Sequence, residues 1–258
     1  MDSKDYKLYH KDGFDSRQHL EDYLSDKPDM VFEEDFLKFP IENLSKTFIE
    51  GHIKGDILID LSAGSMVHHL YAACDFFKNV IVLKFRDRCI MELKRWVDSR
   101  TGAFSWGHAA KIHVEGESDK LQEKENNMRI AIQHVVKCDI EKDNMTDPIV
   151  LPPADCIISA FLLDAVGKDK DDFIRNLKKV SGLLKPEGHF IFFWCLDATY
   201  YTIGNHKFHF LNYDEDFARK ALVGESFVID RVEVKKSMAV SDLIDHKAVI
   251  FIAAHKEK

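Results

Sequence analysis

Several features are missing from this 258-residue sequence, and each absence excludes a class of protein. No apolar run approaches the ~20 residues that cross a bilayer, and the N-terminus is too charged for a signal peptide. The chain has 36 Lys and Arg against 44 Asp and Glu, giving a net charge of −8 without a basic tail. A nucleic-acid partner is therefore not expected. We expect a cytoplasmic protein with no membrane partner.

Paired cysteines are also missing, because the five cysteines are odd in number and none forms a C-x-x-C motif. They are Cys74, Cys89, Cys138, Cys156 and Cys195. Scattered thiols beside apolar runs are typical of packed free cysteines in a reducing compartment. No Cys/His group has the spacing of metal ligands, so no metal site is expected.

What the sequence does have is apolar and aromatic content, at 45% and 11%. That content excludes a disordered chain, and the length fits one domain over residues 1–258. Within it, residues 1–50 are predicted to form a helical cap in which Pro40 kinks or breaks the helix. Residues 100–128, rich in polar residues, are predicted to be an insertion-like excursion with a short strand near 112–114.

Apolar runs alternate with helical patterns along the rest of the chain, and Asp87 is predicted to cap one helix. The expected strands are 56–61, 79–83, 135–138, 154–160, 189–196, 227–234 and 247–254, with a hairpin near 206–210. The expected helices are 66–77, 87–97, 170–184 and 214–221. This α/β alternation predicts a mostly parallel sheet covered on both faces. Ligands of such sheets bind beyond the carboxyl ends of the strands.

Six ordered blocks of the sequence resemble the small-amine N-methyltransferases, the family of the nicotinamide, indolethylamine and phenylethanolamine enzymes. The blocks are Gly55-Asp56-Ile57-Leu58-Ile59-Asp60, the Phe77–Trp96 segment, Lys137-Cys138-Asp139, Leu151-Pro152-Pro153-Ala154-Asp155-Cys156, Leu183-Leu184-Lys185-Pro186 and Tyr200-Tyr201-Thr202-Ile203-Gly204. The resemblance implies a class I methyltransferase fold, Rossmann-like, with seven strands of which the last is antiparallel. It also implies S-adenosylmethionine as methyl donor and a helical N-terminal cap over a small amine.

The resemblance places the cofactor at residues that follow the strands. They are Asp60, Ser62, Gly64, Lys84, Phe85, Asp139, Ile140 and Ala160. Ser62 replaces the first glycine of the family's Gly-x-Gly turn, where a positive φ is costly for a residue with a side chain. Lys84 replaces the acid that accepts hydrogen bonds from both ribose hydroxyls, and a lysine has no acceptor. Asp87 is the alternative acceptor.

The resemblance places a small amine at His19, Tyr23, Asp164, Trp194 and Tyr201, and the candidate catalytic residues are Asp164 and Asp197. Only Asp164, Tyr23 and Tyr201 match the family here. His19 replaces an aromatic of the cap, and Trp194 replaces an acid, with Asp197 as a displaced substitute. Phe161 and Phe210 add bulk beside Ala160 and at a small polar position. The alternative is that Trp194 and Phe161 are core residues, His19 a surface residue and Asp60 a helix cap.

These departures matter because methyl transfer depends on proximity and orientation rather than on acid–base chemistry. We therefore predict a monomeric family member whose methyl transfer to small amines is lost or greatly weakened. Its role is then to bind a small molecule or partner, or to act as a bulk protein, with no cofactor or a different, anionic ligand. The cations of Lys84–Arg88 are either a solvated rim or the site of that anion. The alternative is an active S-adenosylmethionine-dependent N-methyltransferase for a small amine or pyridine.

Overall fold

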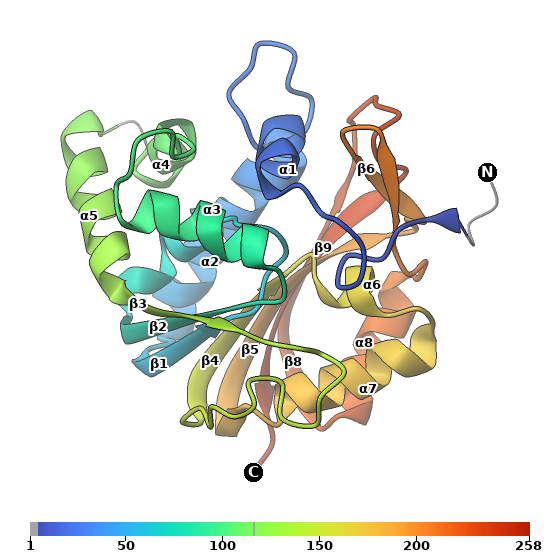
Figure 1. The fold of residues 1–258 in the computed structure, drawn as a ribbon. Coiled ribbons are helices and arrows are strands. Elements are labelled where there is room, and N and C mark those ends of the chain that lie inside the picture. The colour runs from blue at the N-terminus through green and yellow to red at the C-terminus, as the bar shows by residue number, and fades with distance from the viewer. Residues whose placement is uncertain (1–4, 116) are drawn as a thin grey trace.

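A seven-stranded sheet forms the centre of the computed structural model, which describes residues 5–115 and 117–258 (Figure 1). Its strands are β1 (Gly55–Asp60), β2 (Phe77–Lys84), β3 (Ile132–Lys137), β4 (Ala154–Ala160), β5 (Leu184–Leu196), β8 (Phe227–Lys236) and β9 (Ala248–Lys256). They lie in the order β3-β2-β1-β4-β5-β9-β8. The strands from β3 to β5 pair in parallel, and β9 is antiparallel to both of its neighbours. The predicted class I methyltransferase fold is confirmed.

Helices lie on both sides of this sheet, which is why its central strands are apolar on both faces (Figure 1). They are α1 (Ser16–Tyr23), α2 (Phe39–Gly51), α3 (Asp87–Val97), α4 (Gly107–His113), α5 (Leu121–Ala131), α6 (Leu163–Val166), α7 (Lys170–Ser181) and α8 (Glu215–Gly224). A π-helical turn, Glu34–Lys38, precedes α2. The predicted hairpin is confirmed as β6 (Tyr200–Ile203) and β7 (His206–His209). With α1 it stands over one end of the sheet (Figure 1).

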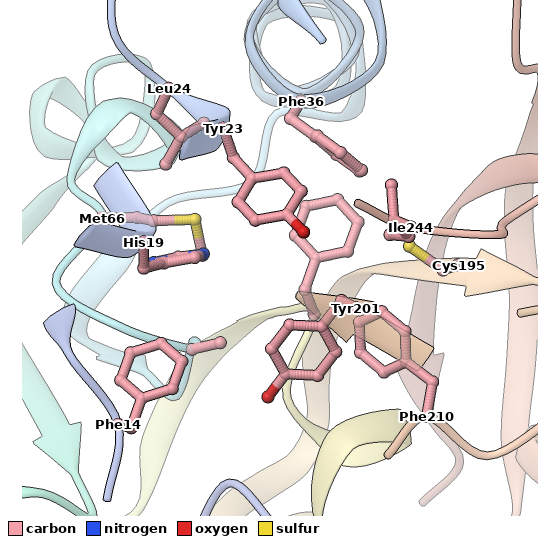
Figure 2. Close-up of a pocket in the computed structure, with 12 residues that line it drawn as sticks. Phe14, His19, Tyr23, Leu24, Phe36, Met66, Cys195, Tyr201, Phe210 and Ile244 are labelled. Carbon is pink, nitrogen blue, oxygen red and sulfur yellow. The ribbon is translucent and has the colours of Figure 1, made fainter. Parts of the chain in front are cut away.

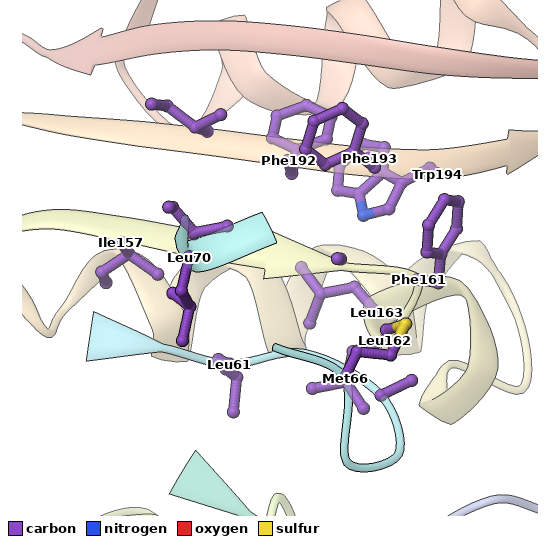
Figure 3. Close-up of a cluster of buried hydrophobic side chains, with 14 of the residues drawn as sticks. Leu61, Met66, Leu70, Ile157, Phe161, Leu162, Leu163, Phe192, Phe193 and Trp194 are labelled. Atoms are coloured by element: carbon purple, nitrogen blue, oxygen red, sulfur yellow. The ribbon is translucent and has the colours of Figure 1, made fainter. Parts of the chain in front are cut away.

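The apolar core fills the space between the strands and their covering elements. Figure 3 shows Leu61 after β1, Ile157 on β4 and Phe192 on β5, and all three are buried. Continuous burial along residues 156–160 of β4 and along the second half of β5 follows from their apolar runs. The carboxyl ends of the parallel strands are therefore held in place by the packed core. The candidate site residues lie at this edge of the sheet.

Two predicted elements are wrong. Residues 66–77 form two short 3-10 turns, His68–Leu70 and Ala73–Asp75, instead of a helix. The whole stretch from 61 to 73 is buried, so it lacks the polar face of an amphipathic helix. Residues 112–114 end helix α4 rather than forming a strand, and the 100–128 region is largely helical where it is described.

Two predicted helix signals also differ. Pro40 is the second residue of α2 and directly follows the π-helical turn Glu34–Lys38, so the helical backbone changes from π to α geometry here and is not broken. Asp87 is the first residue of α3, and Arg86 occupies the N-cap position without a side-chain cap. The Asp87 carboxylate instead pairs with Lys137 Nζ at 2.9 Å.

The five cysteines are free, and all except Cys74 are fully buried. Within residues 5–115 and 117–258, no group of three or more His, Cys, Asp and Glu side chains is arranged to hold a metal ion. The helices of these residues include none whose length and apolar character would suit a membrane crossing.

Candidate functional site

The turn after β1 is built around Asp60, whose carboxylate is fully buried at the end of the strand. Its Oδ1 accepts hydrogen bonds from Ser62 Oγ at 2.6 Å and from His69 Nε2 at 2.8 Å. Burial opposes ionisation, but the His69 imidazole, the nearby Lys84 ammonium and the Ser62 hydroxyl together lower the pKa of Asp60. Asp60 is thus an ionised group whose Oδ1 is bonded within the protein, while its buried Oδ2 has no hydrogen-bond partner among the described residues.

The left-handed backbone of this turn falls on Gly64, with φ of +60°, and not on Ser62. The predicted backbone cost at Ser62 is therefore wrong, and its hydroxyl also accepts the Ala160 N–H at 2.9 Å. Gly64 is covered from the N-terminal segment. Its N–H donates to Tyr9 Oη at 2.8 Å, and a Cβ at Gly64 would lie only 2.5 Å from His19 Nδ1. The space that glycine leaves above its Cα is therefore occupied by the side chains of Tyr9 and His19.

Lys84 ends β2 with its side chain directed into the protein, and only 1% of the residue is exposed. Its Nζ donates to the Ser62 carbonyl at 3.0 Å. Asp87, the alternative acceptor, is 73% exposed and paired with Lys137, so it is directed away from this interior. A buried ammonium therefore occupies the strand end at which the resemblance implies a carboxylate.

The remaining residues of the expected cofactor site lie around the same sheet edge. Phe85, Ile140 and Ala160 are buried. Asp139 is exposed, and its Oδ1 accepts the Glu141 N–H at 2.9 Å. We call Asp60, Ser62, Gly64 and Lys84 the donor face.

Next to the donor face is a cavity of about 40 Å³, enclosed mainly by aromatic rings (Figure 2). The aromatic side chains that line it are Phe14, His19, Tyr23, Phe36, Phe161, Tyr201 and Phe210, and we call it the aromatic cavity. Cavities that accept a benzene ring measure about 150 Å³. The aromatic cavity is therefore too small for a six-membered ring unless its walls move.

Six separate segments supply these rings. α1 carries His19 and Tyr23, the π-helical turn carries Phe36, and β6 carries Tyr201. Phe36 packs edge-on against Phe161 with ring centroids 5.2 Å apart. Phe210 lies 4.4 Å from Tyr201 by the same measure. The packing of these aromatic rings, rather than ion pairs, fills the space of the cavity.

Some polar atoms of the aromatic cavity have hydrogen-bond partners and others have none. Tyr23 Oη donates to the Thr202 carbonyl at 2.7 Å and accepts the Thr202 N–H at 3.1 Å. His19 Nδ1 and Tyr201 Oη are buried and have no hydrogen-bond partner among the described residues. Burial, assisted by the charge of Lys84, lowers the pKa of His19 to about 3, so its ring is neutral near pH 7.

Three expected acceptor residues lie outside the cavity lining. Asp164 is buried behind it, where Oδ2 accepts the Cys195 N–H at 3.1 Å and burial raises the pKa to about 7. Trp194 is directed toward α7 and packs on Phe173, with centroids 4.7 Å apart. Figure 3 shows it beside Phe192 and Phe193 on β5. Asp197 is exposed after β5.

Among the aromatic wall residues, the sequence missed Phe14 and Phe36. Phe36 belongs to an aromatic series with Phe32 and Phe39, which indicated a helix face but not its destination. Phe14 lies in an irregular segment just before α1, where periodicity gives no information.

Comparison with known proteins gives two kinds of match. A profile of the NNMT/PNMT/TEMT family matches residues 4–257. Human nicotinamide N-methyltransferase is 32% identical over 256 residues, covering 98% of this chain and 96% of that protein. Rabbit (Oryctolagus cuniculus) indolethylamine N-methyltransferase is 31% identical over 243 residues, covering 93% of this chain and 92% of the relative.

Solved structures match at much lower identity. A methyltransferase of Methanosarcina mazei, described as S-adenosylmethionine-dependent, has a TM-score of 0.56 at 13% identity, covering 81% of this chain and 97% of its own. The magnesium protoporphyrin IX methyltransferase of Synechocystis with bound S-adenosylhomocysteine has a TM-score of 0.55 at 12% identity, covering 93% of each chain. At these identities the likeness shows the fold alone.

Proposed function

The chain belongs to the NNMT/PNMT/TEMT family, and from that premise we propose that its methyl transfer to small amines is lost or greatly weakened. The family consists of N-methyltransferases of small amines that use S-adenosylmethionine. The observation that carries the proposal is the buried Lys84 ammonium, which bonds to the Ser62 carbonyl at the end of β2.

The donor face does not fit the ribose of S-adenosylmethionine. A ribose held at the end of β2 needs an acceptor for its hydroxyls, and an ammonium can only donate. Lys84 also places a positive charge inside the protein, where it bonds to the Ser62 carbonyl. The neighbouring Gly64 amide and Cα are already covered by Tyr9 and His19. We therefore derive no catalytic step through this cofactor.

The aromatic cavity supports the same proposal independently. At about 40 Å³ it has roughly a quarter of the volume that a benzene ring requires. Its Tyr23 hydroxyl is engaged by backbone groups, and Asp164 and Asp197 lie outside its lining. An acceptor amine would find neither room nor a carboxylate.

In-line methyl transfer gains most of its rate from holding donor and acceptor together in the correct orientation. If side chains of the protein fill both the donor face and the aromatic cavity, most of the catalytic apparatus is lost while the fold is unchanged. The remaining role in this proposal is the binding of a small molecule or a partner, or a bulk-protein role. We further propose that the chain works as one domain, as a monomer, in the cytoplasm, without nucleic acid.

The second candidate is an active S-adenosylmethionine-dependent N-methyltransferase for a small amine or pyridine. The observation that favours it is a set of unpartnered buried atoms, His19 Nδ1, Tyr201 Oη and Asp164 Oδ1, which a bound ligand could satisfy. In this alternative the donor is held by Asp60, Gly64, Phe85, Asp139 and Ile140. The amine is then held by Tyr23, Asp164, Asp197 and Tyr201.

A radiolabelled methyl-transfer assay separates the two candidates. The purified chain is incubated with methyl-labelled S-adenosylmethionine and, in separate reactions, nicotinamide, an indolethylamine and a phenylethanolamine. Human nicotinamide N-methyltransferase serves as the positive control. We expect product formation at the level of the protein-free blank with each amine. Steady turnover on any of them contradicts the proposal and supports the active enzyme.

A further inference from the structure

A second cleft, of about 440 Å³, opens on the surface beside the end of β2, outside the donor face. Its volume lies within the range of about 300–1,000 Å³ that is usual for small-molecule sites. Phe14 and Phe85 form part of its wall, and a Cβ added at Gly13 would meet no atom within 4 Å. The cleft therefore has open space and a partly aromatic wall.

Three cations converge on this cleft from two neighbouring strand ends. Arg86 and Arg88 follow β2, and Lys137 ends β3, where it is the register partner of Lys84. The side chain of Lys84 is directed into the protein. Of the cations in the 84–88 stretch, only Arg86 and Arg88 therefore line the cleft. With Asp87 as the acid in the lining, three positive charges face one negative charge on a protein whose net charge is −8.

The two guanidinium groups differ in how they are held. Arg86 Nη1 donates to the His10 carbonyl at 3.2 Å, which fixes its direction and leaves its other N–H groups for a ligand. Among residues 5–115 and 117–258, no hydrogen bond or ion pair engages the Arg88 side chain. An arginine fork matches the geometry of a phosphate in two parallel hydrogen bonds.

The one acid in the lining does not block an anion. Asp87 and Lys137 form a surface ion pair in which both side chains are mostly exposed, at 73% and 59%. Such pairs contribute only about 0–1 kcal/mol, so a doubly charged ligand can displace Asp87 from Lys137. In nucleotide-binding α/β folds, an arginine near the end of the second strand accommodates a phosphate where an acid otherwise binds ribose hydroxyls.

We propose that this cleft binds a small organic phosphate, with Arg86, Arg88 and Lys137 on the phosphate and the aromatic wall against its organic part. The three cations lie outside the donor face, but Phe85 is shared with the cofactor site of the active alternative. Loss of phosphate binding in the arginine variants therefore tests this proposal, whereas titration with S-adenosylmethionine tests the proposed function.

Isothermal titration calorimetry of the full chain at low salt tests the site with adenosine 5′-monophosphate, pyrophosphate and, as the uncharged control, adenosine. We expect saturable binding of adenosine 5′-monophosphate, weaker binding of pyrophosphate and no binding of adenosine. Raising the salt concentration should weaken the binding, because exposed charges are screened. Absence of saturable binding by both phosphates, or equal binding of adenosine, overturns the proposal.

Variants locate the site. Arg86→Ala and Arg88→Ala should each weaken binding by about tenfold or more, since each removes a charge-assisted contact. Arg219→Ala on α8, whose partner is Glu215 at 2.9 Å, is the matched control and should bind as the native chain does. Equal melting temperatures of the free variants verify that they are folded. Binding that survives both Arg86→Ala and Arg88→Ala places the anion elsewhere and overturns the proposal.

Discussion

The donor face and the aromatic cavity lie side by side, and they are closed by different kinds of interaction. In the donor face the closing groups are polar and bonded to one another, as in the bonds of Asp60 Oδ1 with Ser62 and His69, although Asp60 Oδ2 has no partner in the described part of the chain. In the aromatic cavity the closing groups are rings, and two polar atoms at its wall, His19 Nδ1 and Tyr201 Oη, have no partner. A buried polar group without a partner costs free energy in both regions, so the two closures differ in the kind of interaction, hydrogen bonds in one and ring packing in the other.

This difference predicts which substitutions would make room in the donor face and which would make room in the aromatic cavity. A hydrogen-bonded buried network resists any single change, because removing one member leaves the others buried without partners. A ring wall yields to a reduction in volume, at the cost of the packing that the ring supplied. The following predictions use this contrast, from the largest expected effect to the smallest.

Phe210→Ser should have the largest effect, because it removes a buried ring from the wall of the cavity. We expect a loss of about 3–5 kcal/mol in the free energy of unfolding, as for other buried phenylalanines. The variant should also gain stabilisation from small aromatic amines, because the enlarged cavity admits a ring. Urea unfolding with and without such amines measures both effects.

Phe227→Ser is the matched control for that variant, because Phe227 is equally well buried but lies on β8, outside the cavity lining. It should lose similar stability and gain nothing from the amines. If both variants respond to amines alike, the cavity is not the site of the response.

Asp164→Asn should change the pH dependence of stability. Burial raises the pKa of Asp164 from an ordinary 3.8 to about 7, so the folded state holds a proton that the unfolded chain releases. The native chain therefore loses stability as the pH rises from about 4 to about 7 and stays less stable above that range. Asparagine has no such dependence.

We expect Asp164→Asn to be more stable than the native chain by about 2–4 kcal/mol near pH 8, with a difference that disappears near pH 4. Urea unfolding across that pH range measures it. A constant difference at all pH values would show that Asp164 is ionised in the fold, contrary to the buried neutral acid described above.

Lys84→Met tests the polar closure. The variant keeps an unbranched side chain that is one atom shorter, but loses the bond to the Ser62 carbonyl and a counter-charge near Asp60. We expect a loss of about 1.5–3 kcal/mol in the free energy of unfolding. Lys78→Met, at an exposed pair with Asp56, is the control and should change stability by less than about 1 kcal/mol. If the two substitutions lowered the free energy of unfolding equally, the buried bonds of Lys84 would contribute no more than an exposed ion pair.

Gly64→Ala should have the smallest effect of the four. It places a Cβ at positive φ and against the His19 ring, with an expected cost of about 2 kcal/mol. Gly102→Ala, also at positive φ but with no atom within 4 Å of a Cβ, isolates the backbone cost at about 1 kcal/mol. Thermal unfolding compares them, and an equal loss would mean that His19 does not press on Gly64.

The sequence predicted the sheet well, because strands buried on both faces appear as apolar runs, as in 154–160. It also identified Lys84 as a cation in an acid's place. It could not indicate where that side chain would turn, because its partner is a backbone carbonyl, which has no sequence signature. Burial of every residue from 61 to 73 likewise hid the first 3-10 turn, since polarity does not alternate where every side chain is inside.

The most direct test of the account is the affinity of the native chain for S-adenosylmethionine, measured by calorimetry and by thermal shift. We predict no saturable binding up to about millimolar donor, and hence no rise in melting temperature, because a ligand that binds only the folded state must stabilise it. Micromolar binding by the native chain, little changed in Lys84→Asp, would contradict the central claim. The donor face would then hold its cofactor in spite of the buried lysine.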